Sequence, residues 1–187
     1  IYNKKKNPLL LKQFSHHNKP KLEKIINPYP PMLDDLYKLY YIIRKYKRIT
    51  CLEFGTGWST LVMTEAILEN KRRYYKKIQD LRFNNPFEVH SVDNLKKYIN
   101  ISKKRINHGG QSTHFLYSQN KVTTWNGQIC NEYLKLPKIN PDFIYLDAPD
   151  HKYIDGAISG IKLNQDDFMP MNSDILKIEH FLTPGAI

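Results

Sequence analysis

The chain has 187 residues, of which 41% are hydrophobic and 25% charged, which suits one globular domain with a core of its own. Its sequence has neither an apolar run of the ~20 residues that a membrane helix needs nor the apolar stretch of a secretory signal. The two cysteines, Cys51 and Cys130, are too few for a disulfide framework and lack metal-ligand spacing. We therefore expect a reducing, cytoplasmic setting and no membrane.

Basic residues outnumber acidic ones, 29 to 18, and the net charge is +11. Such an excess is compatible with nucleic acid, an anionic saccharide or a membrane surface as a partner. The lysines and arginines are spread over expected helix ends and loops, which favours an ordinary solvated surface. Nucleic acid is therefore an alternative partner and not the favoured one.

Residues 1–31 are polar, basic and punctuated by prolines, so we expect an extended basic arm there. Residues 32–187 are expected to form one α/β domain. Helical spacing begins at Met32, with acidic residues in the first turn and basic residues in the last, as the helix dipole favours. The last residues, after Pro184-Gly185, read as the start of a further strand, so we expect the C-terminal strands to be missing.

Strand and helix patterns alternate through this domain. The expected strands cover residues 49–54, 87–92, 113–117 and 143–146. The expected helices after the first cover residues 59–70, 94–105, 125–136 and 174–181, with a basic insertion at 71–86 and a break at Gly109-Gly110. This alternation predicts a doubly wound, mainly parallel, Rossmann-like sheet with helices on both faces.

A glycine turn follows the first expected strand. Residues 50–63 read Thr-Cys-Leu-Glu-Phe-Gly-Thr-Gly-Trp-Ser-Thr-Leu-Val-Met, which indicates a buried strand, a turn and the start of a helix. Gly55 and Gly57, on either side of Thr56, let the backbone approach a ligand, and Ser59 stands where a helix needs its cap. Such a turn at the carboxyl end of a parallel strand is a place for a nucleotide-like ligand.

The residues around the turn limit which class of ligand it could bind. Thr60 replaces the third glycine of the dinucleotide fingerprint, and the Gly-Lys-Ser/Thr run of a P-loop is absent from the sequence. Glu53, two residues before Gly55, would repel a pyrophosphate but attract a cation. S-adenosylmethionine is such a ligand, and this stretch resembles the first motif of the class I S-adenosylmethionine-dependent methyltransferases. A structural turn without a ligand is the alternative.

Acidic residues also close two later strands, at Asp93 and Asp147. Ligands of doubly wound sheets lie at these carboxyl ends. We expect Glu53 to face the methionine moiety of the cofactor and Asp93 to accept hydrogen bonds from its ribose hydroxyls. The other expected cofactor contacts at this edge are Gly55, Thr56, Gly57, Ser59 and Asp147. Ser118, after the third strand, is expected near the adenine on position alone. Asp93 lies further from Gly57 than the ~20 residues usual in such units, because residues 71–86 intervene.

Residues 142–153, Asp-Phe-Ile-Tyr-Leu-Asp-Ala-Pro-Asp-His-Lys-Tyr, resemble the strand-four segment of small-molecule O-methyltransferases of the catechol/caffeoyl and sugar-modifying types. The resemblance implies Asp147 as a ligand of a divalent metal such as Mg²⁺, and His151 or Lys152 as a general base. Asp150 is either a second ligand or a partner that orients His151. A metal-bound hydroxyl loses its proton more readily, and an imidazole can accept it during transfer.

The sequence thus predicts S-adenosylmethionine-dependent methylation of a hydroxyl on a small molecule or sugar, with Mg²⁺ as an option. The remaining metal ligands of those families follow a fifth strand, which we expect beyond Ile187. The alternative functions are a nucleic-acid-binding module without chemistry and an RNA methyltransferase. For residues 150–152 the alternative to a catalytic role is an ordinary polar loop. Oligomeric state is not predicted. The other histidines are interpreted as surface or packing residues, among them His16, His17, His90, His108 and His180.

Overall fold

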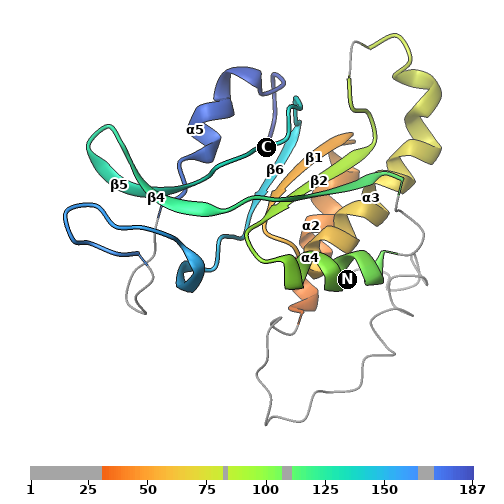
Figure 1. The fold of residues 1–187 in the computed structure, drawn as a ribbon. Coiled ribbons are helices and arrows are strands. Elements are labelled where there is room, and N and C mark those ends of the chain that lie inside the picture. Colours follow the sequence, from red (N-terminus) through yellow and green to blue (C-terminus); the bar gives the residue numbers. More distant parts are fainter. Residues whose placement is uncertain (1–30, 82–83, 107–110, 164–170) are drawn as a thin grey trace, which may run out of the picture. The chain divides into compact units, whose positions relative to one another are not determined.

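The computed structural model describes residues 31–81, 84–106, 111–163 and 171–187 (Figure 1). The chain divides into two units, residues 1–32 and 33–187, and the second unit contains every helix and strand reported below. Of the expected basic arm, residues 1–30 lie outside the described part of the chain, as do residues 107–110 with the expected glycine break.

Four parallel strands form the central sheet, in the order β3-β2-β1-β6. The strands are β1 (Thr50–Phe54), β2 (Glu88–Asp93), β3 (Thr113–Tyr117) and β6 (Phe143–Leu146), which confirms the four expected strands to within a residue or two. Phe54 lies opposite both Val92 and Leu146, so three neighbouring strands end level with one another. This register defines the carboxyl edge of the sheet.

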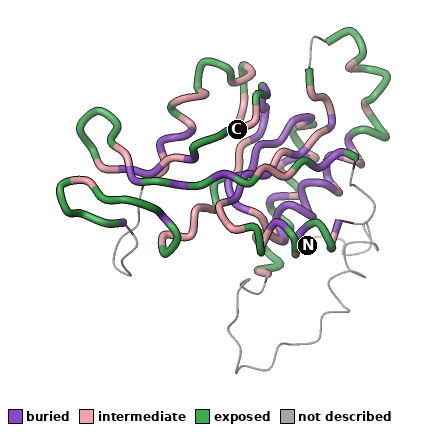
Figure 2. The backbone as a smooth tube through the Cα atoms, viewed as in Figure 1, coloured by how far each residue is buried: buried purple, intermediate pink, exposed green. Residues whose placement is uncertain are grey.

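Three helices cover one face of the sheet: α2 (Leu33–Lys45), α3 (Trp58–Tyr74) and α4 (Lys96–Arg105) (Figure 1). A buried cluster joins α2 and α3 to the sheet, with members Leu39, Ile43, Cys51, Met63, Ala66, Ile67, Val89 and Phe143. Figure 2 shows the buried parts of the backbone in purple, among them most of β1 and much of α3. Each fully buried aliphatic or aromatic side chain contributes roughly 1.5–3 kcal/mol. The helical spacing of apolar residues in α2 predicts this packing.

An antiparallel hairpin and a short helix supply the second cluster, on the other face. The hairpin consists of β4 (Asn120–Trp125) and β5 (Gln128–Tyr133), and α5 (Asp174–Ile178) is followed by a 3₁₀ turn at Glu179–Phe181. This second cluster contains Leu52, Phe54, Val92, Tyr133 and Ile139, with Ile175 and Ile178 of α5 packed against it. The sheet is thus flanked on both faces.

The expected helix over residues 125–136 is wrong, because this segment contains the turn and second strand of the hairpin. Asn126 and Gly127 form the two-residue turn and both have positive φ, 49° and 78°. Asn-Gly is the preferred pair for such a turn, because its backbone twist matches that of the flanking strands. The local turn chemistry overrides the helical spacing of apolar residues.

Three ends of α3 and α4 differ from expectation. Helix α3 continues to Tyr74 and a 3₁₀ turn follows at Tyr75–Lys77, so the start of the expected insertion is helical. Helix α3 begins at Trp58 with Gly57 as its N-cap, so the expectation that Ser59 caps it is wrong. Helix α4 begins at Lys96, two residues later than expected.

Ile187 lies along β6. The Ile144 amide donates to the Ile187 carbonyl at 2.7 Å, and the Ile187 amide donates to the Asp142 carbonyl at 3.2 Å. One residue bonded to two positions of its neighbour in this way follows the parallel ladder, which agrees with the expected start of a strand there. None of the described helices combines the length and apolar character needed to span a bilayer.

Candidate functional site

The residues at the carboxyl ends of β1, β2 and β6 lie next to one another at one edge of the sheet. The Gly55 amide donates to the Val92 carbonyl at 2.7 Å, and the Asp147 amide donates to the Phe54 carbonyl at 2.9 Å. Asp93 is the last residue of β2, one position after Val92. Because paired strands lie about 4.8 Å apart, Gly55, Asp93 and Asp147 form a row across this edge.

Glu53 is fully buried beneath the glycine turn and binds that turn through hydroxyl groups. One carboxylate oxygen accepts a hydrogen bond from the Ser59 hydroxyl, and the other accepts from the Thr60 hydroxyl at 2.6 Å. Burial raises the pKa of Glu53 to about 7, against the effect of these hydrogen bonds, and the nearby charge of Asp147 raises it further. The carboxyl group is therefore poised to change charge near neutral pH.

Thr60 takes a structural role at the position where a dinucleotide fingerprint has its third glycine. Its fully buried hydroxyl accepts from the Gly57 amide at 2.9 Å while donating to Glu53. These two bonds fix the turn to the end of β1. The conformation of the turn is thus set by the protein before any ligand arrives.

The two glycines of the turn have different surroundings. Gly55 has φ +110°, and a Cβ there would lie 3.0 Å from the Cβ of Ala148. Gly57 has extended backbone, and a Cβ there would contact the Ser59 hydroxyl alone, at 3.8 Å. Packing of the chain on itself therefore explains the glycine at position 55 but not the one at position 57.

Asp93 is buried at the end of β2. Its carboxylate accepts from the Leu95 amide at 2.6 Å, and its backbone carbonyl accepts from the Ser118 amide at 3.0 Å. Burial raises the pKa of Asp93 to about 6, against the effects of the Leu95 amide and the Thr56 hydroxyl, while the charge of Asp150 raises it. The loop after β6 thus acts electrostatically on the end of β2.

The turn residues Thr56 and Ser118 use their hydroxyls within the protein. The Thr56 and Ser91 hydroxyls lie 2.7 Å apart, and Ser91 donates to the Gly55 carbonyl at 2.6 Å. The Ser118 hydroxyl accepts from the Lys135 amide at 2.8 Å, which ties the end of β3 to the segment after β5. Both side chains hold the carboxyl edge together.

The loop after β6 carries the expected catalytic residues. Asp147 and Lys152 are exposed, and Asp150 and His151 are half-buried. The His151 Nδ1 atom lies 3.9 Å from the Asp150 carboxylate, and that carboxylate accepts from the Lys152 amide at 3.1 Å. The Asn94 side chain donates to the Tyr153 carbonyl at 2.8 Å and so anchors this loop beside the end of β2.

Two polar residues of the hairpin, Asn120 and Tyr133, were not expected here. The Tyr133 hydroxyl and both polar side-chain atoms of Asn120 are buried with no hydrogen-bond partner in the described part of the chain. Burial raises the pKa of Tyr133, and the charges of Asp93, Asp174 and Glu53 raise it further, which places this ring in the same acidic region. Buried polar atoms of this kind usually bind water or a ligand.

The Asn126-Gly127 pair is the feature of the sequence from which the proximity of Asn120 and Tyr133 could have been predicted. A hairpin predicted from it brings Asn120 and Tyr133 opposite each other, as the observed register has them. A helix over the same segment separates them.

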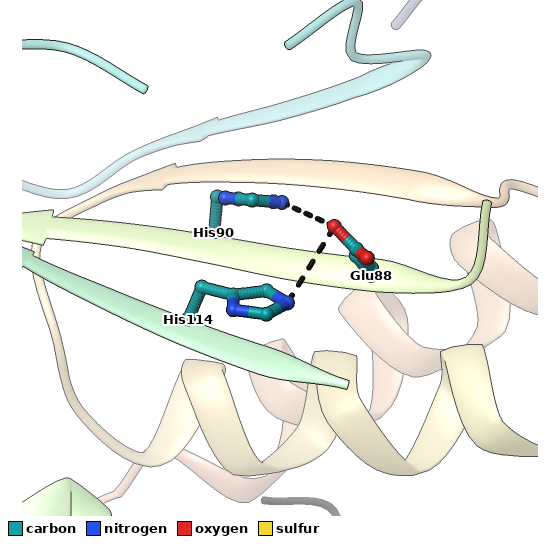
Figure 3. A group of neighbouring side chains, drawn as sticks. All are labelled: Glu88, His90 and His114. Atoms are coloured by element: carbon teal, nitrogen blue, oxygen red, sulfur yellow. Dashed lines mark hydrogen bonds and ion pairs between the residues drawn. The ribbon is translucent and has the colours of Figure 1, made fainter. Parts of the chain in front are cut away.

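A second polar cluster lies away from this edge, toward the amino ends of β2 and β3. Glu88, His90 and His114 point toward one another (Figure 3). The interpretation of His90 as a surface or packing residue did not include these two neighbours. Among the described residues, this is the group of three metal-ligand side chains that lie close enough to share an ion, and Asp147 does not belong to it.

Comparison of the chain with models of known families, with curated proteins and with solved structures finds no match.

Proposed function

We propose that residues 33–187 form a Rossmann-like class I methyltransferase domain that transfers the methyl group of S-adenosylmethionine to a hydroxyl of a small molecule or sugar. The proposal depends on one observation, the row of acidic residues at the ends of neighbouring parallel strands around a glycine turn. The strand order β3-β2-β1-β6 also follows the 3-2-1-4 order of the first half of such sheets.

The chain's own residues would divide the work of binding. Gly57 offers a backbone that a ligand can approach closely, because little of the protein occupies that space. Asp147 would lend negative charge to the side that receives the sulfonium and ammonium groups, and the buried Glu53 would add to it where its carboxyl group is ionised. Asp93, one strand further along, would accept the ribose hydroxyls.

Catalysis would depend mainly on holding the acceptor oxygen in line with the methyl group. Such positioning lowers the activation barrier because the two reactants are held together in the correct orientation. His151 or Lys152, both in the loop after β6, would accept the hydroxyl proton. Asp150 would orient His151. Asp147 is not part of a three-residue ligand set among the described residues, so no step is assigned to a metal at that edge.

Calorimetric titration with S-adenosylmethionine and S-adenosylhomocysteine tests the proposal. We expect binding by the unaltered chain, and at least about tenfold weaker binding by D93N, which keeps the size of the side chain but removes the acceptor pair. D35N is the matched control, because Asp35 is an exposed carboxylate of α2 paired with Lys38. A chain that is folded by circular dichroism and binds neither compound would overturn the assignment.

Nucleic acid is the second candidate partner, supported by a basic hollow at the end of α3. Its lining includes Lys71, Arg72, Arg73, Lys76 and Lys77. Phosphate contacts make affinity fall steeply with salt. Binding of RNA that weakens strongly between low and physiological salt, without S-adenosylmethionine binding, would favour a binding module, whereas both together would favour an RNA methyltransferase.

We also propose a cytoplasmic setting. The two cysteines of the chain, Cys51 and Cys130, are both buried and unpaired. Extracellular proteins commonly oxidise their cysteines to disulfides.

A further inference from the structure

We propose that Glu88, His90 and His114 bind a divalent ion of the zinc class, at a site separate from the proposed methyl-transfer edge. The inference does not depend on the proposed function. It rests on three side chains that the register of two strands brings together.

The backbone explains why the three side chains meet. Glu88 and His90 are two residues apart on β2 and so project from the same face of the sheet. His114 of β3 lies directly opposite His90 in the parallel register. The two imidazole rings stack with centroids 4.6 Å apart and an angle of 25° between their planes.

The donor atoms already lie near the spacing of metal ligands. Glu88 Oε2 is 2.8 Å from His90 Nε2 and 3.5 Å from His114 Nε2, and the donor atoms of all three residues lie within 4.8 Å of one another (Figure 3). Two ligands bound tetrahedrally to zinc at ~2.0–2.1 Å are separated by about 3.3 Å. Small rotations of the side chains would therefore suffice to bind an ion.

The chemistry of the donors favours zinc over magnesium or calcium. Two imidazoles and one carboxylate form a set typical of zinc sites that keep a fourth position open, whereas the harder cations prefer oxygen alone. The Asn85 amide donates to Glu88 Oε2 at 3.0 Å and so orients the carboxylate. Such outer hydrogen bonds support metal ligands.

The three side chains differ in their exposure to solvent. The side chain of His90 is 13% exposed and that of Glu88 26%, while His114 is 47% exposed. An ion could enter from the His114 side and would crosslink β2 to β3.

Titration of the chelator-treated full chain with zinc chloride, followed by calorimetry, tests this proposal. We expect one ion per chain at this site, and at least about tenfold weaker binding by H114A, since even loss of an outer-shell partner costs 10–100-fold. His114 is exposed, so H114A is expected to fold. Cobalt(II) in place of zinc should give the visible absorption of a tetrahedral complex with the unaltered chain and lose it with H114A.

Two variants separate this site from other histidines. H180A removes an exposed imidazole from another part of the fold, and H16A/H17A removes the adjacent histidines of the N-terminal segment. Both should bind zinc like the unaltered chain, and zinc should raise the melting temperature of each but not of H114A. Absence of zinc binding by the unaltered chain, or binding lost in H16A/H17A and retained in H114A, would overturn the proposal.

Discussion

The α-carbon of Gly55 packs so closely against Ala148 that a Cβ on the glycine would lie 3.0 Å from the alanine Cβ. The carbonyl oxygen of Asp147 would be 3.3 Å away. The carboxyl ends of β1 and β6 thus meet without room for a side chain. Two residues later, Gly57 has no such neighbours, so the two glycines of one turn differ in what they do.

Substitution of each glycine by alanine should separate these two roles. G55A combines a steric clash with a positive φ, and we expect a loss of about 1–3 kcal/mol in unfolding free energy. G57A should stay within about 1 kcal/mol of the unaltered chain but weaken S-adenosylmethionine binding, because its methyl group would occupy the ligand's approach. Urea unfolding and calorimetry measure the two effects. Equal stability losses in both variants would contradict the distinction.

Glu53 predicts a specific pH dependence of stability. Its pKa is about 7 in the folded protein against an ordinary value of 4.5, so the folded state binds the proton more tightly. The stabilisation is fully present below pH ~4.5 and is lost as pH rises through ~7, by about 3 kcal/mol in total. E53Q has no proton to lose there, so its unfolding free energy should fall less over this range. Parallel profiles for the two chains in urea unfolding would contradict the assignment.

Asn70 should be one of the costliest polar residues to remove. Its fully buried amide donates to the Arg48 carbonyl at 2.7 Å and the Ile43 carbonyl at 3.2 Å, and its oxygen accepts from Arg44. N70A removes the side-chain donor of the Arg48 carbonyl and one of the two donors of the Ile43 carbonyl, which also accepts from the Arg48 amide at 2.9 Å. The loss of these bonds should lower the unfolding free energy by about 2–4 kcal/mol.

The control for this substitution is Glu69, the neighbouring residue on α3. Its ion pairs with Arg72 and Arg73 are exposed on the arginine side, and it also lies 3.6 Å from Arg44, whose side chain is 15% exposed. E69A should cost about 1 kcal/mol or less. A larger loss for E69A than for N70A in denaturant unfolding would contradict the interpretation of Asn70.

Removal of the Tyr133 hydroxyl, unlike removal of the Asn70 amide, should not destabilise the protein. This buried hydroxyl has no partner within the described part of the chain, so Y133F removes an unsatisfied polar atom and keeps the ring that stacks on Phe54. We expect an unchanged or higher melting temperature. Y133L removes the ring, and its melting temperature, measured by calorimetry, should be clearly lower than that of the unaltered chain. A large loss in Y133F alone would indicate that the hydroxyl has a partner in the protein.

Much of the fold was predictable because the chain's local patterns agree with it. The apolar run at residues 143–146 and the strand before the glycine turn lie in the sheet as expected, and α2 packs through its helically spaced Leu39 and Ile43. The hairpin was predictable in principle from Asn126-Gly127. Prediction of a helix there fails because the turn chemistry of this pair overrides the helical spacing of the neighbouring apolar residues.

The candidate site was predictable to the extent that it depends on chain order. Glu53, Asp93 and Asp147 each end an expected strand, and parallel strands bring such ends to one edge. The placement of α3 over β1 decides which hydroxyl groups bind Glu53. It also decides that Ser59 binds this carboxylate instead of capping the helix. No local pattern encodes that placement.

The sequence by itself determined the four strands of the central sheet and the residues that close them, because apolar runs, glycines and acidic strand ends are local features. Only the tertiary structure decided that His90 lies opposite His114, since the register between β2 and β3 is set by packing of the whole sheet. A shift of one residue would turn the side chain of His114 to the other face of the sheet. The histidine pair is thus a product of the fold.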